Sequence, residues 1–433
     1  MDLNLVAIGG FVVLFALAAL RVPIGVAMGI VGVGGFSLIV GLEPALRQLA
    51  LSAIRSASSE AFGLVPMFLL MGAIATASGM SAELFKAANT WLGHRRGGLA
   101  TATITACGGF AAICGSSVAT AVTMTRVALP EMRSRGYADA IATGTIAAGG
   151  TLGILIPPSI VLAIYGIITE QDIGKLFIAG IIPGLLTMAL FIVTIQIVSW
   201  ASPGSMPASA TRADWPTRLR AIQGVWAIGL LFVFIIGGIY LGMFTPTEAA
   251  GAGAAGAFLI GVARRRLTMP MLIDCLVEAI RTTASVFMVV IGAVMFGYFL
   301  AVTQTTQKIT EWMIGLDFGP YGTLALILLL FFVLGCVLDA LAMVVLTVPI
   351  LLPVILQLGF DPIWFGVIVV VAAELALITP PVGMNVFVIN SVVRDISLMT
   401  IFRGALPFVG MQGVVLVILV LFPAIVLFLP SRM

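Results

Sequence analysis

Residues 153–159 read Gly-Ile-Leu-Ile-Pro-Pro-Ser, and residues 376–382 read Ala-Leu-Ile-Thr-Pro-Pro-Val. A proline inside an apolar helix removes a backbone hydrogen bond that lipid cannot replace. The two Pro-Pro pairs lie 223 residues apart, and other landmarks repeat at that offset. Pro23, Pro130, Gly136, Pro157 and Pro158 recur as Pro246, Pro353, Gly359, Pro380 and Pro381. Matching breaks in two halves of a membrane chain predict a transporter with broken helices around a central site.

The composition places the chain in lipid. Its 433 residues are 61% hydrophobic and 9% charged, more apolar than a soluble fold can bury. The net charge of +3 gives no support for nucleic-acid binding. Four cysteines without CxxC spacing, one histidine and no P-loop motif argue against a disulfide framework, a zinc site and an ATPase. We expect residues 3–20 to be a retained span, because no basic segment precedes them.

The apolar segments predict an all-α polytopic membrane protein with about ten spans. The spans are 3–20, 23–40, 61–76, 137–168, 176–200, 221–242, 246–262, 284–302, 362–393 and 401–428. Segments 137–168 and 362–393 are too long for one straight helix across about 30 Å of hydrocarbon, so each is predicted to be a broken helix. Five spans per half make the repeats inverted. The expected domains are a first repeat (1–200), a cytoplasmic linker (201–220) and a second repeat (221–433).

Two further pairs of segments match across the halves. Residues 98–135 and 320–359 lack a polar turn at their midpoints and are interpreted as re-entrant hairpins, with an ordinary pair of spans as the alternative. Residues 46–54 and 272–280 are amphipathic and are predicted to lie in the membrane interface. They are either arms that brace a moving domain or plain connectors.

Basic residues set the predicted orientation. Fifteen of the 21 Lys and Arg residues fall on one face, five fall on the other, and Arg126 lies within the first hairpin. The positive-inside rule makes the rich face cytoplasmic. Both termini are therefore expected outside the cytoplasm, and the two hairpins are expected to open on opposite faces.

The hairpin tips and the helix breaks are the candidate site. We expect the tip at 114–117 to face the break at 149–158, and the tip at 338–340 to face the break at 379–385. Unwound backbone exposes carbonyl oxygens, which together with hydroxyl groups suit a hard cation such as Na⁺. The N-termini of half-helices suit a carboxylate. The pattern predicts two cation sites that flank one site for an anionic substrate.

Three charged residues in this zone each allow two interpretations. Asp339 is either a cation ligand or the cap of a half-helix. Glu374 either lines a cavity or pairs with a neighbour. Arg126 either attracts a carboxylate or extends to the inner membrane surface.

Four ordered motifs resemble one family over nearly the whole chain. They are Gly-Phe-Ala-Ala-Ile-Cys-Gly-Ser-Ser (109–117), Gly-Thr-Leu-Gly-Ile-Leu-Ile-Pro-Pro-Ser (150–159), Phe-Thr-Pro-Thr-Glu-Ala-Ala (244–250) and Ile-Thr-Pro-Pro-Val-Gly-Met-Asn (378–385). The chain resembles the large membrane subunit of tripartite ATP-independent periplasmic (TRAP) transporters. The resemblance implies a non-enzymatic, sodium-driven importer of an organic acid such as a C4-dicarboxylate or sialic acid. It further implies an elevator motion, a bacterial inner membrane, a small four-helix membrane subunit and a periplasmic substrate-binding protein.

The resemblance also implies site residues. The first Na⁺ site would use backbone oxygens of Cys114, Ser116, Gly153, Ile156 and Pro158, with Cys114 standing where relatives often have serine. The second would involve Asp339, Thr379, Gly383 and Met384, and the substrate would meet Ser117, Thr151, Arg126 and Asn385. No cofactor is expected besides Na⁺ as the coupling ion. The alternative function is a stand-alone sodium–carboxylate symporter that needs no binding protein.

Overall fold

The computed structural model describes residues 2–207 and 212–433, and within these ranges the regular structure is entirely helical. The helices, in chain order, are α1 (Leu3–Ala19), α2 (Ile24–Val40), α3 (Leu42–Ser58), η1 (Glu60–Gly63), α4 (Leu64–Ala77), α5 (Met80–Leu92), α6 (Gly98–Cys114), α7 (Ser117–Ser134), α8 (Asp139–Leu155), α9 (Ile160–Thr169), α10 (Ile173–Ala201), α11 (Trp215–Tyr240), α12 (Pro246–Ala263), α13 (Met269–Val302), α14 (Thr305–Gly315), α15 (Gly319–Gly335), α16 (Ala340–Gln357), α17 (Pro362–Leu377), α18 (Met384–Val392), α19 (Leu398–Leu421), α20 (Ala424–Leu427) and η2 (Pro430–Arg432).

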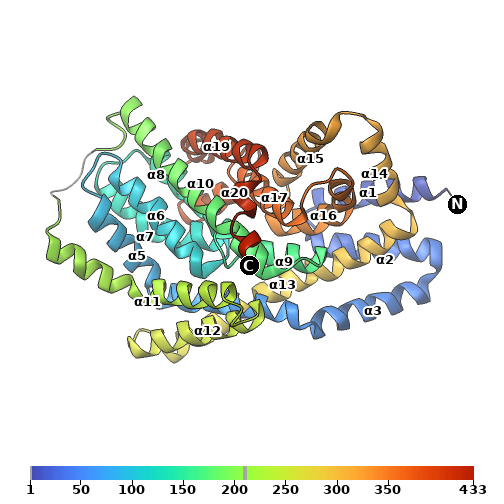
Figure 1. The fold of residues 1–433 in the computed structure, drawn as a ribbon, viewed down its shortest axis with the longest axis horizontal. Helices are drawn as coiled ribbons and strands as arrows, with labels where there is room; N and C mark the ends of the chain where they lie inside the picture. The colour runs from blue at the N-terminus through green and yellow to red at the C-terminus, as the bar shows by residue number, and fades with distance from the viewer. Residues whose placement is uncertain (1, 208–211) are drawn as a thin grey trace.

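The helices form two groups at opposite ends of an elongated molecule. Figure 1 shows α1, α2, α3 and α13 at the end that carries the N-terminus, and α5, α6, α7 and α8 at the other end. Helices α9, α17 and α20 lie between them, near the C-terminus. Helix α8 packs against α6, α7 and α19, so elements from both halves of the sequence surround the first predicted broken helix.

Glycine allows the close approach of α2 to α13. A methyl group on Gly25 would come within 2.7 Å of the Val289 backbone, and one on Gly32 within 2.6 Å of the Met295 carbonyl carbon. Small residues let helix backbones approach where lipid supplies no hydrophobic drive for association. Gly25 and Gly32 are therefore packing residues.

Seven helical segments in the described ranges are long and apolar enough to cross a membrane, and two of them join consecutive elements, η1 with α4 and α8 with α9. They are Glu60–Ala77, Asp139–Thr169, Ile173–Ala201, Trp215–Tyr240, Met269–Val302, Ala340–Gln357 and Leu398–Leu421. The chain is thus a multi-pass membrane protein. One of the seven, Ala340–Gln357, lies in the stretch that the sequence analysis assigned to the second hairpin.

Some helix boundaries differ from the expectation. The amphipathic segment 272–280 and the span 284–302 form one continuous helix, α13, because no glycine or proline separates them. In the first half, Gly63 and Pro66 follow α3, and the chain there passes through the short helix η1 into α4. Helices α5 and α14, at corresponding places in the two halves, were not predicted, and α11 begins inside the expected linker.

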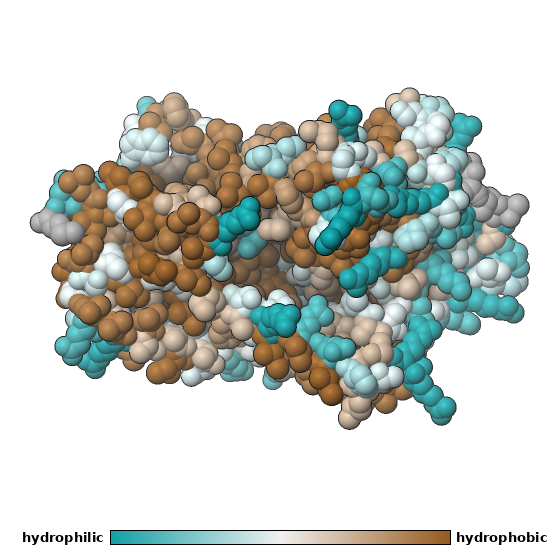
Figure 2. Space-filling model, turned by 180° about the vertical axis from the view of Figure 1, so that it is seen from behind, coloured by the Kyte–Doolittle hydropathy of each residue, from teal (hydrophilic) through white to brown (hydrophobic). Residues whose placement is uncertain are grey.

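Charged side chains gather at the end that carries α5 and α11. Figure 2 shows the molecule from behind, with hydrophilic residues mainly at this end, on the right, and hydrophobic residues over much of the other half. Glu83 on α5 forms ion pairs with Arg264 and Arg266, and the Arg266 guanidinium lies 2.6 Å from Glu83 Oε1. The Arg218 guanidinium lies 5.5 Å from the ring centroids of both Trp91 and Trp215, and these two rings contact each other edge to face. Three arginines that the sequence analysis placed on the basic-rich face, Arg218, Arg264 and Arg266, are therefore held by partners on α5 and α11.

Candidate functional site

The first helix break lies between α8 and α9. Helix α8 ends at Leu155 and α9 begins at Ile160, so the Pro-Pro pair is not helical. The Ser159 hydroxyl accepts from the Leu162 amide at 3.2 Å, which caps α9, and donates to the Ile154 carbonyl. This segment is buried throughout. Ser159 thus satisfies backbone groups on both sides of the break.

The first hairpin tip lies against this break. Gly115 has a left-handed φ of +66°, and a methyl group there would come 2.7 Å from the Pro158 carbonyl oxygen. Ser116 caps α7 by accepting from the Ala119 amide at 3.3 Å. Both the backbone angle and the close approach require glycine. The predicted meeting of this tip with this break is therefore present.

Two carbonyl oxygens face this junction. A methyl group on Gly153 would lie 2.5 Å from the Ser116 carbonyl oxygen, which also accepts from the Thr120 hydroxyl at 2.8 Å. Ser116, Gly153 and Pro158 are thus brought together. Thr120 was missed by the sequence analysis, although its position four residues after Ser116 is the spacing of such a bond.

Two other residues predicted for the first site contact neighbouring helices. The Cys114 carbonyl oxygen lies 3.2 Å from the position of a methyl group on Gly72, so it faces α4. The Ile156 side chain packs on α10, with its Cγ1 2.6 Å from a methyl position on Gly184. Cys114 Sγ lies 3.9 Å from the Ser116 carbonyl oxygen, which is a weak contact.

The second break lies between α17 and α18. Helix α17 ends at Leu377, and α18 begins at Met384 after Gly383, whose φ is +57°. The Thr379 hydroxyl donates to the Leu375 carbonyl at 2.5 Å. The Thr379 carbonyl oxygen lies 3.1 Å from a methyl position on Gly383, so these two predicted residues are together. No side chain caps the N-terminus of α18.

The second hairpin tip contacts this break through sulfur. The Cys336 thiol donates to the Pro380 carbonyl oxygen at 3.5 Å. Asp339 Oδ1 accepts from the Ala342 amide at 2.7 Å and so caps α16, which is one of the two interpretations of this residue. Asp339 is exposed. Cys336 was missed because its partner is a backbone oxygen, which leaves no sequence signal.

Asn385 joins the two halves at the centre. Its Nδ2 donates to the Ala147 carbonyl of α8 at 3.3 Å, while its buried Oδ1 has no hydrogen-bond partner. A methyl position on Gly150 lies 3.2 Å from Asn385 Nδ2 and 3.3 Å from the Ser117 carbonyl oxygen. The adjacent Thr151 hydroxyl donates to Ala148 at 2.7 Å. Ser117 and Asn385 therefore meet at Gly150, and Thr151 is the next residue of α8.

Arg126 and Glu374 are not part of this cluster. Arg126 is exposed and lies nine residues after Ser117 on α7, about 13 Å along the axis. Glu374 is fully buried and accepts from Gln412 Nε2 at 3.0 Å, so it pairs with a neighbour.

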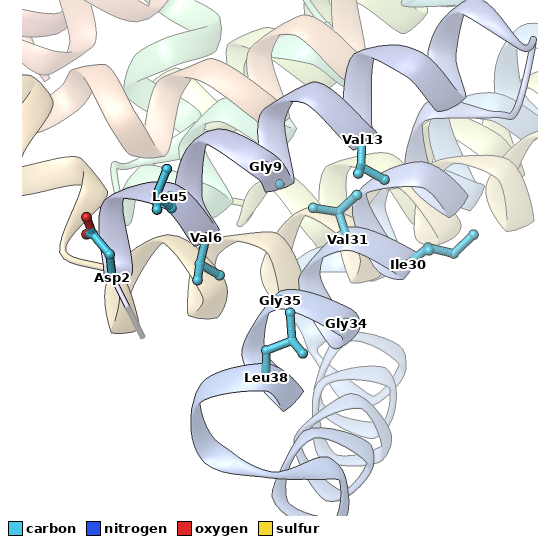
Figure 3. A pocket seen from close by; sticks show the side chains of 11 residues that line it. Asp2, Leu5, Val6, Gly9, Val13, Ile30, Val31, Gly34, Gly35 and Leu38 are labelled. Atoms are coloured by element: carbon cyan, nitrogen blue, oxygen red, sulfur yellow. The ribbon is translucent and has the colours of Figure 1, made fainter.

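A separate groove of about 530 Å³ lies between α1 and α2, away from both breaks. Figure 3 shows that its lining comes from both helices and is apolar apart from Asp2 at one end. It offers no set of cation ligands. Residues 2–207 and 212–433 contain no group of three or more His, Cys, Asp or Glu side chains able to hold a metal ion. The oxygens at the two breaks are carbonyls and hydroxyls, which are hard ligands.

Comparison with known proteins identifies the family. The family model of the "Tripartite ATP-independent periplasmic transporter, DctM component" matches residues 11–425. A C4-dicarboxylate TRAP transporter large permease protein from Pseudomonas aeruginosa is 37% identical over 400 residues, which cover 92% of each chain. An isethionate TRAP transporter permease protein from Oleidesulfovibrio alaskensis is 35% identical over 96% of this chain and 66% of its own length.

A solved structure supports the fold. The Alcanivorax borkumensis YdaH transporter, reported to have an unusual topology, matches 98% of both chains with a TM-score of 0.60. The sequence identity is 15%, so this likeness concerns the fold alone.

Proposed function

This chain belongs to the DctM component family of TRAP transporters, and from that premise we propose that it is the large membrane subunit of a sodium-driven importer of an organic acid. Its curated relatives are permease proteins rather than enzymes. The observation that carries the proposal is the contact of a hairpin tip with a helix break in each half, Gly115 with Pro158 and Cys336 with Pro380. Such a junction gathers backbone oxygens where lipid would otherwise leave them unsatisfied.

Sodium is the proposed coupling ion. The first site would draw on carbonyl oxygens of Ser116, Gly153 and Pro158, with Ile156 and Cys114 contributing after a small rearrangement. The second would draw on Thr379, Gly383 and Met384, with Asp339 close to its tip. Oxygen ligands without a thiolate or imidazole favour a hard cation over a transition metal.

The organic acid is proposed to bind between the two sodium sites. Two features support this place: the N-terminus of α18 has no side-chain cap, and Asn385 Oδ1 is buried without a partner. Free amide groups at a helix start attract a carboxylate, and the Asn385 oxygen accepts from a substrate hydroxyl or faces a cation. Ser117 and Thr151 complete the proposed contacts. The exposed Arg126 would act only on the approach of the anion.

The proposal includes inverted repeats at 1–200 and 221–433, the linker 201–220, hairpins at 98–135 and 320–359, and an elevator motion. It also includes a bacterial inner membrane with both termini periplasmic, on the distribution of basic residues. The proposed partners are a small four-helix membrane subunit and a periplasmic substrate-binding protein. The isethionate relative leaves a third of its length outside the match, which is room for a second membrane component.

Reconstituted uptake tests the proposal. Proteoliposomes would hold the chain with the small subunit and binding protein from its operon, and labelled organic acids would be offered with and without a Na⁺ gradient. We expect uptake that needs Na⁺ and the binding protein and needs no ATP. Equal uptake without Na⁺ would refute sodium coupling, and equal uptake without the binding protein would favour the stand-alone symporter.

A matched pair of variants tests the site. Thr120→Val removes the hydroxyl that bonds the Ser116 carbonyl at the first tip. Thr310→Val removes an equivalent buried bond, to Thr306 at 2.8 Å, on α14. We expect the first variant alone to raise the Na⁺ concentration that gives half-maximal uptake. The same Na⁺ dependence in both variants would place the cation elsewhere.

A further inference from the structure

Helices α17 and α19 are joined by a buried pair of polar side chains, Glu374 and Gln412. Both residues are 0% exposed. Gln412 Nε2 donates to Glu374 Oε2 at 3.0 Å. The other oxygen of each group, Glu374 Oε1 and Gln412 Oε1, has no hydrogen-bond partner. Two buried oxygens of one contact are therefore unsatisfied.

One proton would satisfy both oxygens. Each of them is an acceptor, and an ionised carboxylate has no hydrogen to donate. A proton on Glu374 Oε1 turns that oxygen into a donor toward Gln412 Oε1, while Oε2 continues to accept from Nε2. The carboxylic acid and the amide then form a reciprocal pair with two hydrogen bonds. A buried polar pair is stable only when all of its members are bonded.

No counter-charge supports an ionised Glu374. None of the salt bridges among the described residues includes Glu374. The helices packed against α17 are α8, α9, α10, α15, α16, α18, α19 and α20. Their charged or titratable residues, counting the cap of α16, are Asp139, Tyr165, Lys175, Tyr321, Asp339 and Arg403.

None of these groups can neutralise the carboxylate. Asp139 is bonded to Arg133, and the Tyr165 hydroxyl donates to the Pro362 carbonyl at 2.6 Å. Lys175 lies in the first turn of α10 beside its cap, while Tyr321 and Asp339 are exposed. Arg403 is exposed and lies nine residues before Gln412 on α19, about 13 Å along the axis. A buried, unpaired carboxylate is among the costliest groups in a membrane protein.

We infer that Glu374 and Gln412 form a proton-binding site between α17 and α19, in which Glu374 is a neutral acid that donates to Gln412 Oε1. A sodium ion between the same two oxygens is disfavoured, because such an ion needs about six oxygen ligands. The neighbouring residues of α17, Ala372, Ala373 and Ala376, offer only methyl groups as side chains.

This proton site is separate from the proposed sodium coupling, because it requires neither substrate nor Na⁺. It lies on α17, the first half of the second broken helix. Glu374 is three residues before the end of α17 at Leu377, about 4.5 Å along the axis, and the second break follows directly. While the proton is bound, two hydrogen bonds hold α17 to α19, and the two helices move together. Because the packed state binds the proton and a separated, hydrated pair releases it, rising pH weakens the α17–α19 contact.

Infrared spectroscopy of the full chain in lipid nanodiscs tests the site. We expect a protonated-carboxyl band at neutral pH that disappears in Glu374→Gln and persists in Glu248→Gln, which alters an exposed carboxylate at the start of α12. In Gln412→Leu the band should shift, because the acid loses its acceptor. Absence of the band from the native chain would overturn the proposal, as would its persistence in Glu374→Gln. A band that disappears on addition of Na⁺ would assign a cation site instead.

The exchanged variant Glu374→Gln with Gln412→Glu keeps the same atoms and swaps their helices. We expect this variant to retain the band, even if Glu374→Gln alone folds poorly. A folded exchanged variant without the band would show that the surroundings, rather than the pair, hold the proton, and would overturn the proposal. The midpoint of thermal unfolding should fall between neutral and alkaline pH in the native chain and less so in Glu374→Gln. Equal slopes would contradict the assigned site.

Discussion

The two helix breaks occupy equivalent positions in the sequence but different surroundings in the molecule. Pro157 and Pro158 are buried, whereas Pro380 and Pro381 are exposed. The first tip turns within two residues at Gly115, and the second leaves helix α15 at Gly335 and starts α16 only at Ala340. The first junction is thus closed and backbone to backbone, and the second is wider and rests on a thiol contact.

The capping residues follow the same division. Ser116 and Asp339 are 223 residues apart and both cap the returning helix of their tip. The cap is a neutral hydroxyl at the buried first tip and a carboxylate at the second tip, where Asp339 is exposed. The two copies of the motif therefore have unequal environments, which the proposed alternating access of inverted repeats would require in any single conformation.

The largest expected effect comes from filling the first junction. In Gly153→Ala the added methyl group would lie 2.5 Å from the Ser116 carbonyl oxygen and 2.8 Å from Thr120 Oγ1. Overpacking of this kind costs about 1–3 kcal/mol, and about 1.4 kcal/mol corresponds to tenfold. We expect sodium-dependent uptake to fall by about tenfold or more, measured at equal protein in proteoliposomes.

The equivalent position in the second half is the control. Residue 376 is already alanine, and a methyl position on Gly335 lies 2.5 Å from its Cβ. Ala376→Gly removes one methyl group from a wider junction, so uptake should stay within about twofold, or less than 1 kcal/mol. Equal losses in the two variants would show that the junctions are not distinguished by their packing.

A smaller effect is expected from the cap of the second tip. Asp339→Asn keeps an acceptor for the Ala342 amide and removes the charge, whereas Asp339→Ala removes both. Loss of a cap costs about 1 kcal/mol. If Asp339 acts as a cap, Asp339→Asn should retain most of the uptake and Asp339→Ala should lose several-fold. Equal loss of sodium dependence in the two variants would instead make the carboxylate a cation ligand.

The sequence predicted the breaks and their partners because proline and glycine act locally. A Pro-Pro pair ends a helix wherever it stands, and the meeting of each tip with its break followed from the repeat. The inequality of the two junctions was not predictable, since it depends on the long-range packing around each break rather than on local sequence. The continuity of α13 through residues 281–284 was also missed. The sequence changes there from amphipathic to apolar, which suggested two segments, although no glycine or proline interrupts the helix.

Long-range partners were the other limit. Asn385 was expected at the substrate site, but its bond to Ala147 joins residues 238 apart. Gln412 was not singled out, and only the packing of α17 on α19 makes it the partner of Glu374. The turn of Arg126 away from the centre depends on the rotation of α7, which a hairpin prediction leaves open.

Cysteine accessibility would sharpen the comparison further. Val337 at the second tip is 63% exposed and Ser117 at the first is 5% exposed. We expect Val337→Cys to react several-fold faster than Ser117→Cys with a water-soluble maleimide. The native cysteines Cys107, Cys114, Cys275 and Cys336 are buried and give a low background. On the proposed elevator motion, Na⁺ should shift the two rates in opposite directions. Rates that respond alike would favour a fixed scaffold.

The smallest expected effect concerns the ion pairs that link the first hairpin to the chain after the second break. Arg133 on α7 bonds both Asp139 and Asp395, the latter at 2.7 Å in the segment between α18 and α19. The hydrogen bond from Arg133 holds the pKa of Asp395 below its usual range. A carboxyl group whose pKa is lower in the folded than in the unfolded state stabilises the fold at a pH above its unfolded-state pKa, about 3.9 for Asp. This stabilisation is lost as the pH falls through the folded-state pKa. Because Asp395 is well exposed, solvent and salt screen the pair.

In Asp395→Asn, the midpoint of thermal unfolding should therefore drop slightly at neutral pH and low salt and depend less on pH below about 4. Asp214→Asn, at an exposed carboxylate before α11, should leave both unchanged. A neutral-pH loss in Asp395→Asn that persists in high salt would show that the segment is held by packing rather than by charge.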